Sequence, residues 1–244
     1  MNVMVISTQP CKRWMRTPDR GGKTVTEAHK RFVEDFTNPH AWLMMADNLH
    51  EQATEIYDGR AHSTIITKTD ANKTVLAQTR AIDKSVFLLG GFALENAIKA
   101  FLVFENPSWI SNGRLSSKLR SHSLSRLQRQ STLIPYKTRH IQVLEAFESG
   151  LDSWFRYPCA LTVEDTTEER HLYDPLWRGY GTLMHAYGRK LGILLNQGWN
   201  GPHGWYGRWT IQGRSLGYDT HRTTRGRVIH HAPKHETFKG NASQ

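Results

Sequence analysis

Along residues 70–105, the stretch around which the chain is organised, apolar residues follow a three-then-four spacing. They stand at Val75, Leu76, Ile82, Val86, Leu89, Ala93, Ala97, Phe101 and Phe104. This spacing predicts one long helix with a continuous apolar stripe. From Ser85 onward the other faces of the predicted helix are apolar too, which is typical of a helix surrounded by protein. We therefore expect the core to be built around this segment.

Four further helices are predicted from helical spacing and from terminal signals. The first begins at the N-cap Asn38, with Pro39 as its first helical residue, and ends near Gly59, where a left-handed C-cap is expected. A short helix capped by Ser121 or Ser123 is expected to end near residue 131, and another is expected over residues 135–154. The last is capped by Asp174 and ends before Gly198. These elements predict an all-α fold, an antiparallel bundle of about five helices over residues 38–197.

The two ends of the chain lack this pattern. Residues 1–37 are rich in Lys and Arg and interrupted by Pro and Gly, which favours a mobile basic arm with a short strand at residues 3–6. Residues 198–244 form a basic tail rich in Gly, His and aromatic residues, expected to be ordered over residues 199–211 and mobile beyond about Gly213. Residues 60–69 are too short and mixed to assign, and the acidic residues 164–169 are expected to form an exposed loop.

Composition adds a preference for negatively charged partners. The 32 Lys and Arg exceed the 22 Asp and Glu, so the formal net charge is +10. Polyanions are natural partners of such a chain, although a general surface excess of cations gives the same sum. The two cysteines, Cys11 and Cys159, have neither a zinc-ligand spacing nor a disulfide framework, which favours a reducing compartment. The first residues lack the basic-then-apolar order of a secretory signal, so a cytoplasmic protein is expected.

Three polar residues interrupt the apolar helix near its middle: Glu95, Asn96 and Lys99. They make a membrane span expensive, and we expect no membrane association. Glu95 and Lys99 are four residues apart, so their side chains lie one above the other. On an apolar face such charges either form a structural ion pair or line a pocket, and the sequence leaves both possibilities open.

Three stretches resemble the HEPN superfamily (higher eukaryotes and prokaryotes nucleotide-binding domain). Residues 88–103, LLGGFALENAIKAFLV, resemble its second-helix signature, His122-Ser-Leu-Ser-Arg-Leu127 resembles its His-x-Leu-x-x-Leu motif, and Trp154-Phe-Arg-Tyr-Pro158 resembles its Arg-Tyr-Pro motif. The resemblance implies a HEPN-like helical bundle that forms a homodimer and binds RNA or a nucleotide. It further implies a toxin or defence factor, with an antitoxin or a nucleotidyltransferase as partner.

Nuclease members of that superfamily carry an arginine and a histidine four to six residues apart on a late helix, and they cleave RNA without a metal. Arg178 and His185 have six residues between them and lie on the last predicted helix, where the spacing places both on one face. A histidine can move the proton of a ribose hydroxyl, and an arginine can stabilise charge on the phosphate. The alternative is a solvated helix face. The pair Arg225 and His230 has similar spacing, but in the glycine-rich tail, and is attributed to chance.

Four residues of the resembling motifs are expected to converge: Glu95, Lys99, His122 and Arg156. Arg156 is expected to pair with a core carboxylate such as Glu95. Such a cluster would be either a structural lock or a nucleotide pocket, and the sequence does not separate the two.

The first part of the tail mixes aromatic and basic residues that suit contact with single-stranded RNA, namely Trp205, Tyr206, Arg208 and Trp209. The alternative is that the tryptophans pack back on the bundle. His230, His231, His235 and Glu236 do not complete a metal-ligand set, so neither a metal nor a cofactor is predicted.

Two functions follow from the sequence. The leading hypothesis is a HEPN-like protein that binds RNA or a nucleotide, with metal-independent endoribonuclease activity as its catalytic form. The alternative is a non-catalytic helical module for dimerisation or protein interaction.

Overall fold

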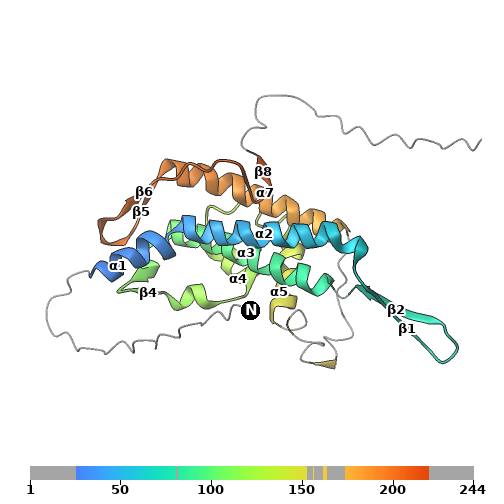
Figure 1. Ribbon diagram of the computed structural model, residues 1–244. Helices are drawn as coiled ribbons and strands as arrows, with labels where there is room; N and C mark the ends of the chain where they lie inside the picture. The colour runs from blue at the N-terminus through green and yellow to red at the C-terminus, as the bar shows by residue number, and fades with distance from the viewer. Residues whose placement is uncertain (1–25, 81, 153–155, 157–161, 164–173, 220–244) are drawn as a thin grey trace, which may run out of the picture.

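The computed structural model describes residues 26–80, 82–152, 156, 162–163 and 174–219 of the chain, and these residues are mostly helical (Figure 1). The helices longer than one turn are α1 (Glu27–Arg31), the π-helix η1 (Phe32–Thr37), α2 (Pro39–Gly59), α3 (Asp83–Glu105), α4 (Leu124–Gln130), α5 (Ile141–Asp152) and α7 (Asp174–Gln197). The expectation of an all-α fold is confirmed at this level.

Short 3₁₀ turns and strand pairs connect and flank the helices. The turns are η2 (Arg60–His62), η3 (Pro107–Trp109), η4 (Ser117–Arg120) and η5 (Pro202–Gly204). Four separate antiparallel pairs are formed by β1 (Ile65–Thr69) with β2 (Val75–Arg80), β3 (Ile110–Ser111) with β4 (Arg114–Leu115), β5 (Trp199–Asn200) with β6 (Tyr206–Gly207), and β7 (Arg214–Ser215) with β8 (Tyr218–Asp219).

Helix α3 is the centre of the fold, as its apolar faces predicted. It contacts α2, α4, α5 and α7, and α2, α3 and α7 run alongside one another (Figure 1). Two adjacent glycines allow α5 to approach closely, because a Cβ on Gly90 would lie 2.8 Å from the Phe147 ring and one on Gly91 would lie 2.9 Å from Leu151. By length and composition α3 could also cross a membrane, but 78% of its most apolar window is buried, as in a core helix.

The predicted extension of this helix back to residue 70 is wrong, because the helix begins at Asp83. The preceding residues form the β1–β2 hairpin, which projects from the helical body (Figure 1). The Asp70 backbone N–H donates to the Thr74 carbonyl oxygen and closes the turn of the hairpin, and Lys73 takes a positive φ of 63°. Val75 and Leu76 are both more than half exposed, so they do not belong to the buried stripe of the later residues. Their match to its helical spacing is a coincidence.

Most other helix ends agree with their sequence signals. The Asn38 side chain accepts the Ala41 N–H at 2.9 Å and caps α2, and Gly198 takes φ +100° directly after α7. Gly59 is not a left-handed cap, because its φ of −76° lets the helix continue into η2. The helix expected from residue 135 begins instead at Ile141, since Tyr136 has a positive φ of 59° that an α-helix does not accommodate.

Both ends of the bundle extend further than predicted. The expected arm includes α1 and η1, and Val33 of η1 is buried in the core. The described part of the tail extends past Gly213, because residues 214–219 form β7 and β8 with the fully buried Leu216 between them, and residues 220–244 lie outside the described residues. The expected strand at residues 3–6 and the acidic loop at residues 164–169 lie outside the described residues.

Candidate functional site

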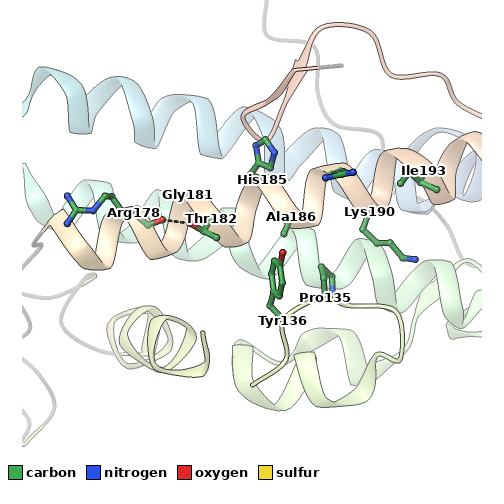
Figure 2. A pocket seen from close by; sticks show the side chains of 10 residues that line it. Pro135, Tyr136, Arg178, Gly181, Thr182, His185, Ala186, Lys190 and Ile193 are labelled. Carbon is green, nitrogen blue, oxygen red and sulfur yellow. Dashed lines mark hydrogen bonds between the residues drawn. The ribbon is translucent and has the colours of Figure 1, made fainter. Parts of the chain in front are cut away.

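Helix α7 carries the two residues predicted to be catalytic on its exposed side. Its other side is buried through residues such as Leu183, Tyr187 and Leu191. A groove of about 670 Å³ follows the exposed side (Figure 2). From α7 it is lined by Arg178, Gly181, Thr182, His185, Ala186, Arg189, Lys190 and Ile193. The helical spacing therefore placed Arg178 and His185 on one side correctly.

The opposite wall of this groove is the loop between α4 and α5, through Pro135 and Tyr136. The Tyr136 side chain is 46% exposed, and the Arg139 guanidinium lies 5.8 Å from the centre of its ring. Three cationic residues of α7 line the groove, and none of its lining residues is acidic. The groove thus combines positive charge with one accessible aromatic ring.

Arg178 and His185 do not converge on one point. Seven residues of α-helix separate them by about 10 Å along the axis. Arg178 lies at one end of the groove, whereas His185 points toward the segment that carries β7 and β8 (Figure 2). The Nδ1 atom of His185 lies 3.1 Å from the Gly217 carbonyl oxygen. Because a carbonyl oxygen only accepts, Nδ1 carries the proton of this hydrogen bond, and Nε2 of the neutral ring then carries the lone pair.

The first turn of α7 is held by contacts to the end of α2. The Asp174 carboxylate accepts hydrogen bonds from the Tyr57 hydroxyl at 2.8 Å and from the Arg60 guanidinium at 2.6 Å. These two hydrogen bonds lower the pKa of Asp174, and the bond from Tyr57 has the larger effect. Burial, followed by the hydrogen bond to Asp174, raises the pKa of Tyr57 to about 12. Trp177 stacks on the Tyr57 ring at 4.4 Å, which fixes the helix turn that carries Arg178.

A second polar site lies in the core, where three of the four expected residues meet. The Lys99 ammonium lies 2.5 Å from Glu95 Oε1, and His122 Nδ1 lies 2.9 Å from Glu95 Oε2. The side chains of Glu95 and Lys99 are 6% exposed, whereas that of His122 is 44% exposed. The Lys99 ammonium also lies 5.6 Å from the centre of the Trp42 ring. Glu95 therefore orients a histidine whose ring reaches the surface.

Arg156 does not join this cluster, and the expected pairing with Glu95 is wrong. Its guanidinium lies 5.7 Å from the centre of the Phe92 ring, and Arg156 itself is exposed. Phe92 is three residues before Glu95 and so occupies the neighbouring position on α3. Both oxygens of Glu95 already have cationic or hydrogen-bonding partners, which leaves an apolar ring as the contact of the guanidinium.

The N-cap of α4 agrees with the expectation in its position but not in its hydrogen bond. Ser123 is at the N-cap position, but its hydroxyl donates to Glu148 at 2.6 Å. The same carboxylate accepts the Ser125 N–H at 2.8 Å. A side chain of α5 thus caps α4, next to His122.

The tryptophans of the tail pack back on the bundle, as the alternative interpretation required. Trp205 and Trp209 are half-buried against the core, and their ring centres are 5.5 Å apart. Tyr206 is 57% exposed, and Arg208 donates to the Asn196 side chain at 3.3 Å. The four residues do not form one open stacking platform.

Sequence reasoning missed Tyr136 and Lys190, which line the groove. Lys190 follows Arg189 on a helix whose exposed side was recognised, so a wider helical face would have included it. No local signal identifies Tyr136, because only the tertiary fold brings its loop to α7.

No group of His, Cys, Asp and Glu suited to a metal ion occurs among the residues that the structure describes. His230, His231, His235 and Glu236, as well as Arg225, lie outside them. No protein-family model, no curated protein sequence and no solved structure matches the chain significantly.

Proposed function

We propose that this chain is a HEPN-like protein that binds single-stranded RNA in the groove along α7. The observation that supports the proposal best is the groove itself, which offers three cationic side chains and an exposed Tyr136 ring without an acidic lining residue. Arginine and lysine hold phosphates, and an aromatic ring stacks on a base of any type. The motif resemblance and the net charge of +10 point to the same class of ligand. A toxin or defence role, an antitoxin or nucleotidyltransferase partner and a cytoplasmic location stay predictions.

The spacing along α7 suits an extended ligand. Arg178 and Arg189 are eleven residues apart, which corresponds to about 16 Å along the helix axis. One phosphate does not bridge that distance, so the two arginines would hold different phosphates of one strand. Tyr136 would stack on a base between them.

Cleavage in this groove would pair His185 with Arg189 more readily than with Arg178. His185 and Arg189 are four residues apart, so their side chains are neighbours on the helix surface. With Nδ1 engaged by Gly217, Nε2 of His185 would act on the ribose hydroxyl while Arg189 stabilises the phosphate charge. Arg178 would then serve binding.

The test is binding of a labelled single-stranded RNA over a range of salt concentrations. Tyr136→Ala is expected to weaken binding about 5- to 150-fold, since base stacking contributes about 1–3 kcal/mol. Arg189→Ala is expected to weaken binding and to reduce the slope of log K against log salt by about one. Arg129→Ala, an exposed arginine of α4, is the control. Equal losses for Arg189→Ala and Arg129→Ala would exclude the groove as the binding site.

Cleavage is tested separately with the same RNA. Incubation with and without chelator compares the wild type with His185→Ala. We expect chelator-resistant cleavage by the wild type and none by the variant. Equal cleavage by both proteins would remove His185 from the mechanism, and binding without any cleavage would leave the groove a binding site only.

One observation supports the alternative function, a dimerisation module. The β1–β2 hairpin projects from the body and exposes Ile65, Ile66, Val75 and Leu76, each about half exposed (Figure 1). A two-stranded hairpin is marginally stable in water, and its outer edges are ready to pair with another strand. A homodimer through the hairpin predicts that Ile66→Lys converts the dimer to a monomer in light scattering, whereas Lys68→Glu does not. A wild type that is already monomeric at high concentration would exclude it.

A further inference from the structure

A second groove lies at the start of α2 and has the opposite charge. Its volume is about 800 Å³, and it is formed by η1, the first half of α2 and Trp209. Four carboxylates line it, those of Glu34, Asp35, Asp47 and Glu51. We call it the acidic groove. It stands out on a chain whose net charge is +10.

Two of these carboxylates are already engaged. Asp35 pairs with Arg31 at 3.4 Å, on the surface, and Asp47 accepts the backbone N–H of Leu216. Burial is the largest cause that raises the pKa of Asp47, and the charge of Glu51 raises it further. A cation placed between Asp47 and Glu51 would relieve that repulsion. Glu34 and Glu51 are both exposed, so they are accessible to such a ligand.

The groove also has apolar and aromatic surface. Met44 and Met45 are 48% and 51% exposed, and the Trp209 ring stacks on His40 with ring centres 5.4 Å apart. Burial lowers the pKa of His40, which favours the uncharged form of this ring. Thioethers adapt to irregular apolar groups, and aromatic faces attract guanidinium and ammonium groups. The groove therefore suits a segment with arginine or lysine side chains and a few large apolar residues.

We propose that the acidic groove binds the chain's own residues 11–23. This segment holds five cations and one acid together with Trp14 and Met15, and its cations are Lys12, Arg13, Arg16, Arg20 and Lys23. Its charge and its apolar residues thus match those of the groove. The proposal is independent of RNA binding, because it uses neither α7 nor Tyr136.

The connection between segment and groove is short. Residue 26 is the N-cap of α1, and seven residues of helix, about 10 Å, separate Glu27 from Glu34 at the edge of the groove. Each residue of an extended chain spans up to about 3.3 Å, so residues 11–23 can reach back along the groove. A short tether gives an effective concentration of about millimolar, so a contact with a dissociation constant below about 1 mM is mostly occupied.

Zero-length carbodiimide cross-linking of the full chain at low protein concentration tests the contact. We expect cross-links from Lys12 or Lys23 to Glu34 or Glu51 within one chain. Glu34→Gln/Glu51→Gln is expected to lose them, as well as to raise protease cleavage after Arg13 and Arg16. Glu55→Gln, on the exposed side of the same helix but outside the groove, is expected to change neither.

Methyl NMR of the full chain provides a readout that does not depend on cross-linking. Arg13→Ser/Arg16→Ser is expected to shift the methyl signals of Met44 and Met45, whereas Arg225→Ser/Arg227→Ser is not. Signals that stay in place in the first variant would overturn the proposal. So would cross-links found only between an isotope-labelled and an unlabelled copy, which would show that a second copy fills the groove.

Discussion

Glu95→Gln is expected to be the most damaging single change in the buried polar cluster. The substitution keeps the shape of the side chain and removes its charge, so the Lys99 ammonium, 6% exposed, stays in the core without a carboxylate. Removing one partner of a buried ion pair costs about 3–5 kcal/mol. For a domain of this size that corresponds to a fall of about 6–20 °C in the melting temperature. The free energy of unfolding is measured in urea, with Glu55→Gln on the surface of α2 as a control expected within about 0.5 kcal/mol of the wild type.

The partner substitution sharpens the test. Lys99→Met leaves Glu95 with its hydrogen bond to His122 at 2.9 Å, so we expect a smaller cost of about 1–3 kcal/mol. The double variant Glu95→Gln/Lys99→Met is expected to be more stable than Glu95→Gln alone, because no uncompensated charge remains. The reasoning fails if Glu95→Gln behaves like the surface control, or if the losses of the two single variants simply add.

Three further predictions concern packing and pH. Gly90→Ala should lower the free energy of unfolding by about 1–3 kcal/mol, because its Cβ would meet Phe147. Gly181→Ala should raise the free energy of unfolding by about 0.5–1 kcal/mol, because no atom lies within 4 Å of the added Cβ. Urea unfolding measures both. Burial lowers the pKa of His50 to about 4, so the unfolded chain binds the proton of this histidine more tightly than the folded chain does. The free energy of unfolding should therefore fall as the pH falls from about 6.5 to 4, by about 3 kcal/mol at most. His50→Gln should largely remove this loss in thermal melts at several pH values. Leu216→Ala should cost about 2–5 kcal/mol, because this side chain is fully buried between β7 and β8, and an unchanged urea midpoint would contradict this.

Sequence patterns were sufficient where a helix buries one side or all of its surface. The caps at Asn38 and Gly198 set one end each of α2 and α7, and most of the apolar residues from Val86 onward are buried in α3. The Glu95–Lys99 pair was also predictable, because two residues four apart on a helix must be neighbours. These inferences depend only on local geometry, which the sequence specifies directly.

The errors have a different origin. In residues 70–82 an isolated hairpin leaves Val75 and Leu76 half exposed, so burial did not impose the alternating pattern that identifies most strands. Residues 214–219 are held by the buried Leu216 and by hydrogen bonds from the Leu216 N–H to Asp47 and from His185 to the Gly217 carbonyl, which is too little for any period to reveal. In both places the fold is decided by a few contacts that are distant in sequence.

The same distinction governs the groove along α7. Helical spacing predicts on which side of a helix a side chain lies, and this prediction was right for Arg178 and His185. It does not predict which atoms lie opposite that side chain. In this groove the carbonyl oxygen of Gly217, 32 residues further along the chain, contacts Nδ1 of His185. That contact, with the distance of about 10 Å to Arg178, makes Arg189 the better placed arginine for any reaction at His185. For the proposed ribonuclease activity, Arg189→Ala should then abolish cleavage while Arg178→Ala mainly weakens RNA binding, and the reverse result in single-turnover assays would restore the pairing suggested by the motif.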